Sequence, residues 1–261
     1  MHQLQDAINA RVYRRAGIER QYLDDTLWRA EGIALLKYQP AFAGKDVLDI
    51  GVGTGRTTVY LAPLARRYQA IDYSPEMVRC FEQTCPGIPI ALADMRDMSR
   101  FRDSEFDFVL ASNNVFDATG HEDRLRTLHE IHRLLRPGGM LMFTSHNRDR
   151  KGAAHWPRLE LSRNPVTQVL LAGHWCKALV NHIRLRKFQM FAEDYAILND
   201  PAHDCALLHY YIGSTAQRKQ LGEQGFELLE ILDCLGDSVA PDSLAEHSHW
   251  LLYVVRRIPV S

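Results

Sequence analysis

Two spacings of apolar residues alternate along the first 150 positions of the chain. Short apolar runs, each too short for a buried helix, predict strands. They lie at residues 47–50, 68–71, 91–93, 106–111 and 140–143. Between them, apolar residues recur at helical spacing, most clearly over 122–135, where they form one face of an amphipathic helix. Strands that alternate with helices predict βαβ units and a doubly wound, mostly parallel sheet.

Helical spacing also covers residues 1–40, which predicts an N-terminal helical cap broken near Gly17. Residues 148–208 insert a long segment after the fifth strand, and the apolar spacing that follows Pro165 predicts a helical lid. Two further apolar runs, 226–232 and 250–255, predict the last two strands. We therefore expect one domain, with a cap at 1–40, a core at 41–147, a lid at 148–208 and core completion at 209–261.

The first strand ends in a glycine-rich loop, Gly51, Gly53 and Gly55, that leads into a helix. Glycine allows strained backbone angles and close approach of a ligand, and the helix start exposes unpaired N–H groups. Such a loop suits a nucleotide-like ligand. The spacing is G-x-G-x-G, whereas the dinucleotide fingerprint requires its third glycine where Arg56 stands, so an NAD-binding dehydrogenase is disfavoured.

Acidic residues end the next two strands. Asp72 follows the second strand, where a carboxylate can accept hydrogen bonds from both hydroxyls of a ribose. Asp94 and Met95 follow the third strand, where an acceptor and an apolar side chain can flank an adenine ring.

In order and spacing these motifs, together with Phe106–Asn113 and Leu135–Phe143, resemble the class I S-adenosylmethionine-dependent methyltransferases over roughly residues 40–147. The resemblance implies a seven-stranded sheet whose last strand is antiparallel. It also implies S-adenosylmethionine as cofactor and assigns residues to it by motif position. Those residues are Asp49, Gly51, Gly53, Thr54 and Gly55 around the methionine part, Asp72 at the ribose, Tyr73, Met77, Asp94 and Met95 at the adenine, and Tyr22 from the cap near the carboxylate.

The fourth strand leads into Asn113, Asn114 and Asp117, at the sheet edge where cofactor and acceptor should meet. We expect Asn113 to serve cofactor and catalysis, and Asn114 and Asp117 to contact substrate, although both amides could equally satisfy the turn backbone. The sequence here is not Asn-Pro-Pro-Tyr or Asp-Pro-Pro-Tyr, which demotes nucleobase and glutamine amide acceptors.

An imidazole ends the fifth strand. His146 is the best-placed histidine for proton transfer or substrate orientation, and a substrate-lining role is an equal alternative. One of Tyr210 or Tyr211 can also face the substrate, because successive residues of an extended segment point to opposite sides, with core packing as the alternative.

Composition narrows the partners. Lys and Arg number 31 against 32 Asp and Glu, so no net field favours nucleic acid or an anionic membrane. The 5 cysteines are scattered and have no zinc spacing, which predicts reduced thiols, no metal site and a cytoplasmic location. The chain begins without an apolar signal segment. A homodimer is left open.

These features together predict metal-independent methyl transfer to a small-molecule nucleophile by in-line displacement, with nitrogen slightly favoured over oxygen. Two alternatives stay open. A sealed pocket without room for an acceptor would make the protein a lyase or cyclase that releases methylthioadenosine by attack of the cofactor's own amine. A blocked exit from the fourth strand would make it a non-catalytic cofactor-binding protein.

Overall fold

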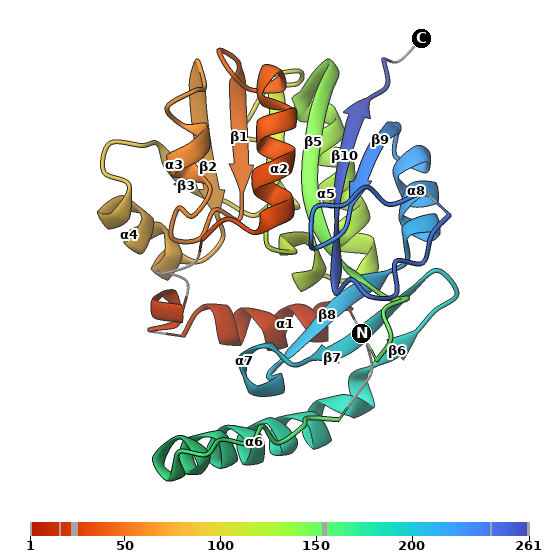
Figure 1. Ribbon diagram of the computed structural model, residues 1–261. Coiled ribbons are helices and arrows are strands. Elements are labelled where there is room, and N and C mark those ends of the chain that lie inside the picture. The colour runs from red at the N-terminus through yellow and green to blue at the C-terminus, as the bar shows by residue number, and fades with distance from the viewer. Residues whose placement is uncertain (1, 16, 22–25, 153–155, 241, 260–261) are drawn as a thin grey trace.

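A computed structural model describes residues 2–15, 17–21, 26–152, 156–240 and 242–259. Its centre is a twisted sheet with helices on both sides (Figure 1). The core strands are β1 (Asp46–Ile50), β2 (Arg67–Asp72), β3 (Ile90–Leu92), β4 (Phe106–Ala111), β5 (Leu135–Asn147), β9 (Phe226–Leu232) and β10 (Trp250–Arg257). Strands β3, β2, β1, β4 and β5 are parallel neighbours, and β10 lies antiparallel between β5 and β9. This confirms the doubly wound sheet and its antiparallel last strand.

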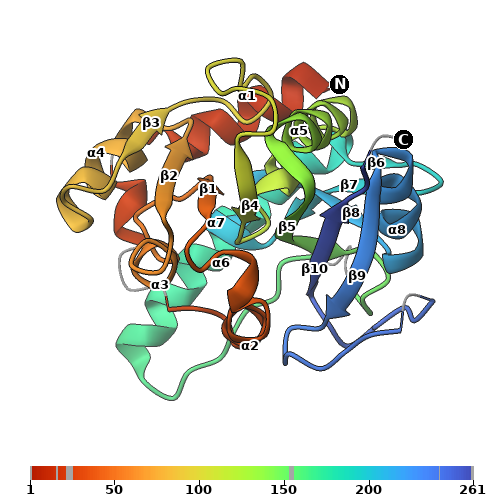
Figure 2. The same ribbon diagram turned by 90° about the horizontal axis from the view of Figure 1, so that it is seen from above.

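Apolar faces on both sides of the sheet hold the helices in place. The core helices are α2 (Arg29–Lys37), α3 (Thr58–Leu61), α4 (Pro75–Thr84), α5 (His121–Leu134) and α8 (Ser214–Glu223). Leu128 and Ile131 of α5 pack on one face, whereas Ala30 and Ala34 of α2 pack on the other. Figure 2 shows α2 and α5 on opposite sides of β4 and β5. All five residues of β1 are buried, as expected for a central parallel strand.

The insertion after β5 contains a long helix and three strands. Its elements are α6 (Pro165–Leu185), η4 (Arg186–Phe188), β6 (Met190–Phe191), β7 (Tyr195–Asp200), α7 (Ala202–Cys205) and β8 (Leu207–Ile212). The helical insertion is confirmed, but the sequence analysis did not predict that β6, β7 and β8 form an antiparallel extension of the sheet. The proposed lid boundary at 208 falls inside β8.

Strand β8 extends the sheet beyond the end of β4. Its pairing with β5 begins at His146, which is opposite Tyr211, whereas β4 pairs with β5 only as far as Phe143. Beyond the last residue of β4, β8 is therefore the strand that pairs with β5. The insertion covers this part of the carboxyl edge of the sheet.

The N-terminal cap begins with α1 (His2–Tyr13), which Figure 1 shows lying across the lower edge of the core sheet. Gly17, at φ +88°, separates α1 from η1 (Ile18–Gln21), as the sequence predicted. Asn9 fixes the cap, because its amide donates to the carbonyls of Ala118 and Leu208 at 2.8 and 2.7 Å and accepts from the Leu208 N–H at 3.0 Å. Among the described helices, none is both long and apolar enough to cross a bilayer.

Candidate functional site

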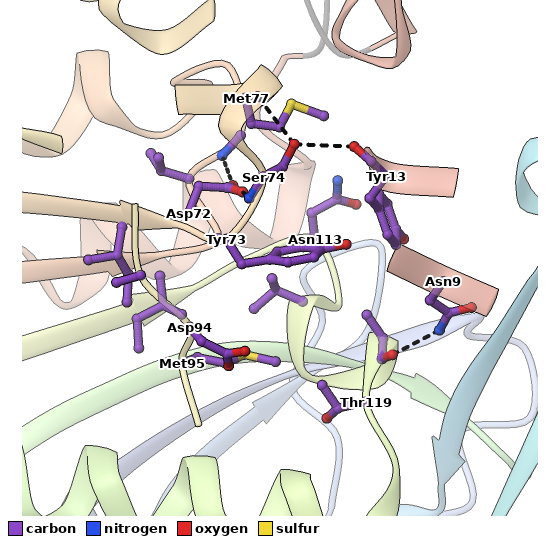
Figure 3. A pocket seen from close by; sticks show the side chains of 18 of the residues that line it. Asn9, Tyr13, Asp72, Tyr73, Ser74, Met77, Asp94, Met95, Asn113 and Thr119 are labelled. Carbon is purple, nitrogen blue, oxygen red and sulfur yellow. Dashed lines mark hydrogen bonds between the residues drawn. The ribbon is translucent and has the colours of Figure 1, made fainter. Parts of the chain in front are cut away.

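A cavity lies between α1 and the carboxyl ends of β1, β2 and β4 (Figure 3). Its wall consists of the glycine loop, the turns after β2, β3 and β4, η3 (Val115–Ala118) and the inner face of α1. Most of the predicted cofactor residues line it. They are Gly51, Gly53, Thr54, Asp72, Tyr73, Met77, Asp94, Met95 and Asn113.

The glycine loop closes one end of this cavity. Gly51 has φ +65°, and a Cβ built on it would lie 2.1 Å from Cγ2 of Val115, so only glycine fits between the loop and η3. The Gly53 N–H donates to Oδ2 of Asp72 at 3.0 Å, which ties the loop to the end of β2. Gly51 and Gly53 both line the cavity, so at these two positions the loop presents its backbone without a side chain.

Asp72 holds a fixed orientation at the cavity wall. Its Oδ1 accepts from the Ser74 N–H at 2.9 Å, and its residue surface is only 5% exposed. Burial raises the pKa of this carboxyl to about 6. Backbone N–H groups of Gly53, Ser74 and Tyr73 lower the pKa of this carboxyl but do not outweigh the effect of burial, and an ionised carboxylate can accept further hydrogen bonds from a ligand.

One ring, two thioethers and a carboxylate form another part of the cavity wall. Tyr73, Met77 and Met95 contribute apolar surface, and Figure 3 shows Asp94 next to Met95. Burial would raise the pKa of Asp94, but hydrogen bonds from Arg96 lower it overall. Arg96 also pairs with Asp6 of α1, so the cap is joined electrostatically to the cofactor site.

Two predicted cofactor residues, Asp49 and Gly55, contact residues in the cavity lining or outside it. Asp49 is 1% exposed and accepts hydrogen bonds from the hydroxyls of Thr57 at 2.6 Å and Tyr68 at 2.7 Å, and burial raises its pKa to about 6. Gly55, at φ +96°, leaves room for Cys85, whose Sγ would lie 2.5 Å from a Cβ there. Neither is among the described residues that line the cavity. Tyr22 lies outside the described residues.

Several lining residues were not predicted from the sequence. Asn9 and Tyr13 reach the cavity from α1. In the sequence, Arg56 is notable only because it stands where a dinucleotide motif has its third glycine. In the structure it lines the cavity and donates two hydrogen bonds to Glu31 of α2, at 2.6 and 2.9 Å. The helical spacing of apolar residues in 1–40 indicated a cap, but it carried no signal for which side chains face the cavity.

At the exit of β4, two consecutive asparagines take left-handed backbone angles. Asn113 and Asn114 both have φ +55°, and both line the cavity. The Asn114 N–H donates to the Thr144 hydroxyl at 2.7 Å, which fixes the turn to β5. Asparagine tolerates this conformation better than most residues, so part of its role here is structural.

Asp117 and His146 lie behind this turn. Asp117 is fully buried and accepts from Arg124 at 2.6 Å and from Nδ1 of His146 at 2.8 Å. Burial would raise the pKa of Asp117, but the charge of Arg124 lowers it overall. Burial would likewise lower the pKa of His146, but its hydrogen bond to Asp117 and the charge of Asp200 raise it. Neither residue is among the described lining of the cavity.

The two candidate tyrosines are also packed away from it. Tyr210 is fully buried, lies over the Arg124 guanidinium and hydrogen-bonds Nδ1 of His121 at 2.8 Å. The Tyr211 hydroxyl donates to Asp200 at 2.6 Å. Both belong to β8, and the core-packing alternative describes them better than direct contact with the cofactor cavity.

The core of the chain matches known methyltransferases. Residues 47–139 match a family model described as a methyltransferase domain. Demethylmenaquinone methyltransferase of Tropheryma whipplei (strain Twist) is 30% identical over 156 residues, which cover 58% of this chain and 62% of that protein. Malonyl-[acyl-carrier protein] O-methyltransferase of Pectobacterium atrosepticum is 30% identical over 132 residues, 51% of this chain and 50% of that protein. The similarity thus spans only part of these relatives.

Solved structures resemble the whole fold. An S-adenosylmethionine-dependent methyltransferase from Clostridium acetobutylicum superposes with a TM-score of 0.63 at 14% identity, covering 96% of this chain and 98% of that one. The 1,6-didemethyltoxoflavin-N1-methyltransferase of Burkholderia thailandensis, with bound 1,6-didemethyltoxoflavin and S-adenosylhomocysteine, gives 0.61 at 16% identity, covering 99% and 91%. At such identities the likeness concerns the fold.

Proposed function

We propose that this chain, which belongs to the class I S-adenosylmethionine-dependent methyltransferases, transfers the methyl group of its cofactor to a small-molecule acceptor. One observation carries the proposal. The glycine loop, Asp72, the pair Asp94 and Met95, and the exit of β4 all line one cavity beneath α1. These are the motifs that the sequence resemblance assigns to S-adenosylmethionine, and together they line this one cavity.

The cavity provides a distinct environment for each part of S-adenosylmethionine. We assign the ribose hydroxyls to the two oxygens of Asp72, and the adenine to the apolar surface of Tyr73, Met77 and Met95 with Asp94 at its edge. The methionine part would then follow the backbone of Gly51 to Thr54, which leaves the sulfonium near Asn113.

The acceptor would enter between Asn113 and α1. The lining contributed by α1 and by the segment after β4 includes the amides of Asn9 and Asn114 and the hydroxyls of Tyr13 and Thr119, which orient polar groups but are poor proton acceptors. The carboxylate of Asp6 on α1 also lines the cavity, but it is paired with Arg96. A neutral amine needs no base before it attacks, whereas a hydroxyl usually does. This supports nitrogen as the first acceptor class to test, with rate enhancement coming from alignment and exclusion of water.

The names of the relatives do not fix the substrate. They refer to demethylmenaquinone, malonyl-[acyl-carrier protein] and 1,6-didemethyltoxoflavin, which differ chemically from one another. The lining of this cavity therefore has to be tested with a broad set of small molecules.

The test uses S-adenosylmethionine with a deuterated methyl group. The purified protein is incubated with this cofactor alone and then with a metabolite extract, and the products are identified by mass spectrometry. S-Adenosylhomocysteine formed only with extract, together with a labelled acceptor, would support methyl transfer. Methylthioadenosine formed without acceptor above the spontaneous rate, or no cofactor turnover with any extract, would overturn it. The Asp72→Ala variant provides the matched protein lacking the ribose contact.

A further inference from the structure

Three strands bring two imidazoles and a carboxylate together behind Asn114. His146 comes from the end of β5, Asp200 from the end of β7 and His209 from β8. Oδ2 of Asp200 lies 3.5 Å from Nε2 of His146 and 3.4 Å from Nδ1 of His209. All three potential ligand atoms lie within 4.8 Å of one another.

Each of these side chains is held from its far side. Nδ1 of His146 is hydrogen-bonded to Asp117, which turns Nε2 toward the cluster. Oδ1 of Asp200 accepts from the Ala202 N–H at 2.7 Å, and Nε2 of His209 is 3.2 Å from the Tyr13 hydroxyl. Outer partners of this kind orient the ligands of metal sites, most typically as a carboxylate behind a histidine.

Two buried polar atoms at the cluster lack a hydrogen-bond partner among the described residues. They are Nδ1 of His209 and Oδ1 of Asn114. His209 is only 6% exposed, and its unpartnered nitrogen points toward Asp200. The nearest polar contact of Nδ1 of His209 is the 3.4 Å approach to Asp200, so this buried nitrogen favours an additional partner such as a bound ion.

The local charge suits a cation. Arg124 pairs with Asp117, and Asp200 faces the two imidazoles. The Tyr211 hydroxyl donates to Oδ2 of Asp200 at 2.6 Å, and a bound metal ion would require this carboxylate to be ionised.

We propose that His146, Asp200 and His209 bind one divalent transition-metal ion. Two imidazoles with one carboxylate suit zinc, iron or cobalt, whereas calcium and magnesium prefer oxygen ligands alone. Asn114 supplies a fourth group, because its Nδ2 lies 3.2 Å from Nε2 of His146 and a half-turn of the amide would present the unpartnered Oδ1 instead. Since the ligands come from β5, β7 and β8, the ion would fasten the insertion to the core sheet.

Cobalt(II) is the probe that tests this site. The purified full chain is stripped with a chelator and titrated with Co²⁺ at pH 8, and visible absorption and metal content are measured. We expect one equivalent of bound cobalt with ligand-field bands, and a higher melting temperature when Zn²⁺ is added. Asp200→Asn and His209→Gln should each lower the affinity for cobalt at least tenfold.

His129→Gln is the matched control, because it removes an exposed imidazole from α5 and should leave cobalt binding unchanged. Binding of S-adenosylhomocysteine by each variant verifies that it is folded. The absence of stoichiometric cobalt in the wild-type protein, equal binding by Asp200→Asn, or equal loss in His129→Gln would each overturn the proposal. None of these readouts depends on methyl transfer, so the metal site and the proposed function succeed or fail separately.

Discussion

Asp72 is a carboxylate held in a fixed orientation at the proposed cofactor site. It is fixed by the N–H groups of Gly53 and Ser74 before any ligand arrives, so a ribose would meet an acceptor already oriented. Hydrogen bonds to a charged group contribute about 1.5–3 kcal/mol each. We therefore expect Asp72→Ala to weaken S-adenosylmethionine binding by about 10- to 100-fold or more in calorimetry. Asp97→Ala removes an exposed carboxylate and should retain wild-type affinity; equal affinities of the two variants would contradict the ribose assignment.

The raised pKa of Asp72 predicts a pH dependence of cofactor binding. Its pKa is about 6 without ligand, because burial disfavours the charge. Above that pH the carboxylate is ionised and would accept both ribose hydroxyl hydrogens, whereas below it a bound proton would occupy an acceptor position. Affinity should therefore be constant from pH 7 to 8 and fall below about pH 6, by at most about tenfold per pH unit for one proton. Calorimetry at constant ionic strength measures this, and an affinity that rises on acidification would refute it.

Arg124 is a residue whose role is stability. It is fully buried, pairs with Asp117 at 2.6 Å and also donates to Gln217 at 2.6 Å. Removing one member of a buried ion pair leaves an uncompensated charge and costs about 3–5 kcal/mol. Arg124→Leu should lower the free energy of unfolding by about that amount in urea titrations.

The double variant Arg124→Leu with Asp117→Asn provides the control. Because it removes both charges, it should be less destabilised than the sum of the two single changes. Strict additivity would show that the two side chains are not energetically coupled.

At the scale of elements, the glycine loop packs against η3 only because Gly51 has no Cβ. Gly51→Ala would bring a methyl group within 2.1 Å of Val115. Gly44 has a similar φ of +69° but nothing within 4 Å of its Cβ position. Gly44→Ala therefore measures the backbone cost alone, about 1–2 kcal/mol. We expect Gly51→Ala to be more destabilising in urea and to weaken cofactor binding, and Val115→Ala to restore part of both losses. Equal effects at the two glycines would show that the loop yields easily.

The position of a residue relative to the strands determines whether its place in the site could be predicted from the sequence. Gly51, Asp72 and Asp94 follow directly from strands with clear apolar patterns, and parallel strands bring their carboxyl ends to one edge. Asn9 could not be predicted, because its partners Ala118 and Leu208 are distant in sequence. His146 was expected to line the substrate site, but its surroundings depend on β8 pairing with β5 past the end of β4, which no local pattern encodes.

At the scale of the whole molecule, two helices are candidates for covering the cofactor cavity, namely α1 and α6. Asn9 and Tyr13 of α1 line the cavity, whereas α6 contributes none of its described lining and buries only Ala178 and His182. Figure 1 shows α6 farther from the core sheet than α1. We therefore expect bound S-adenosylhomocysteine to protect the amides of α1 from hydrogen exchange and to leave those of α6 unchanged.

Mass spectrometry of exchanged peptides measures both segments in one experiment. At a ligand concentration of about 100 Kd, linkage stabilises the bound state by about 2.7 kcal/mol, so exchange that requires cofactor release should slow by up to about 100-fold. Asp72→Ala at the same ligand concentration should show little protection anywhere, which separates binding from a general solvent effect. Protection confined to α6 would instead make the insertion the cover. Asn9 of α1 hydrogen-bonds the backbone of Leu208 in β8. Modest protection that extends from α1 into β8 would therefore mean that cofactor binding stabilises the insertion through its contacts with α1.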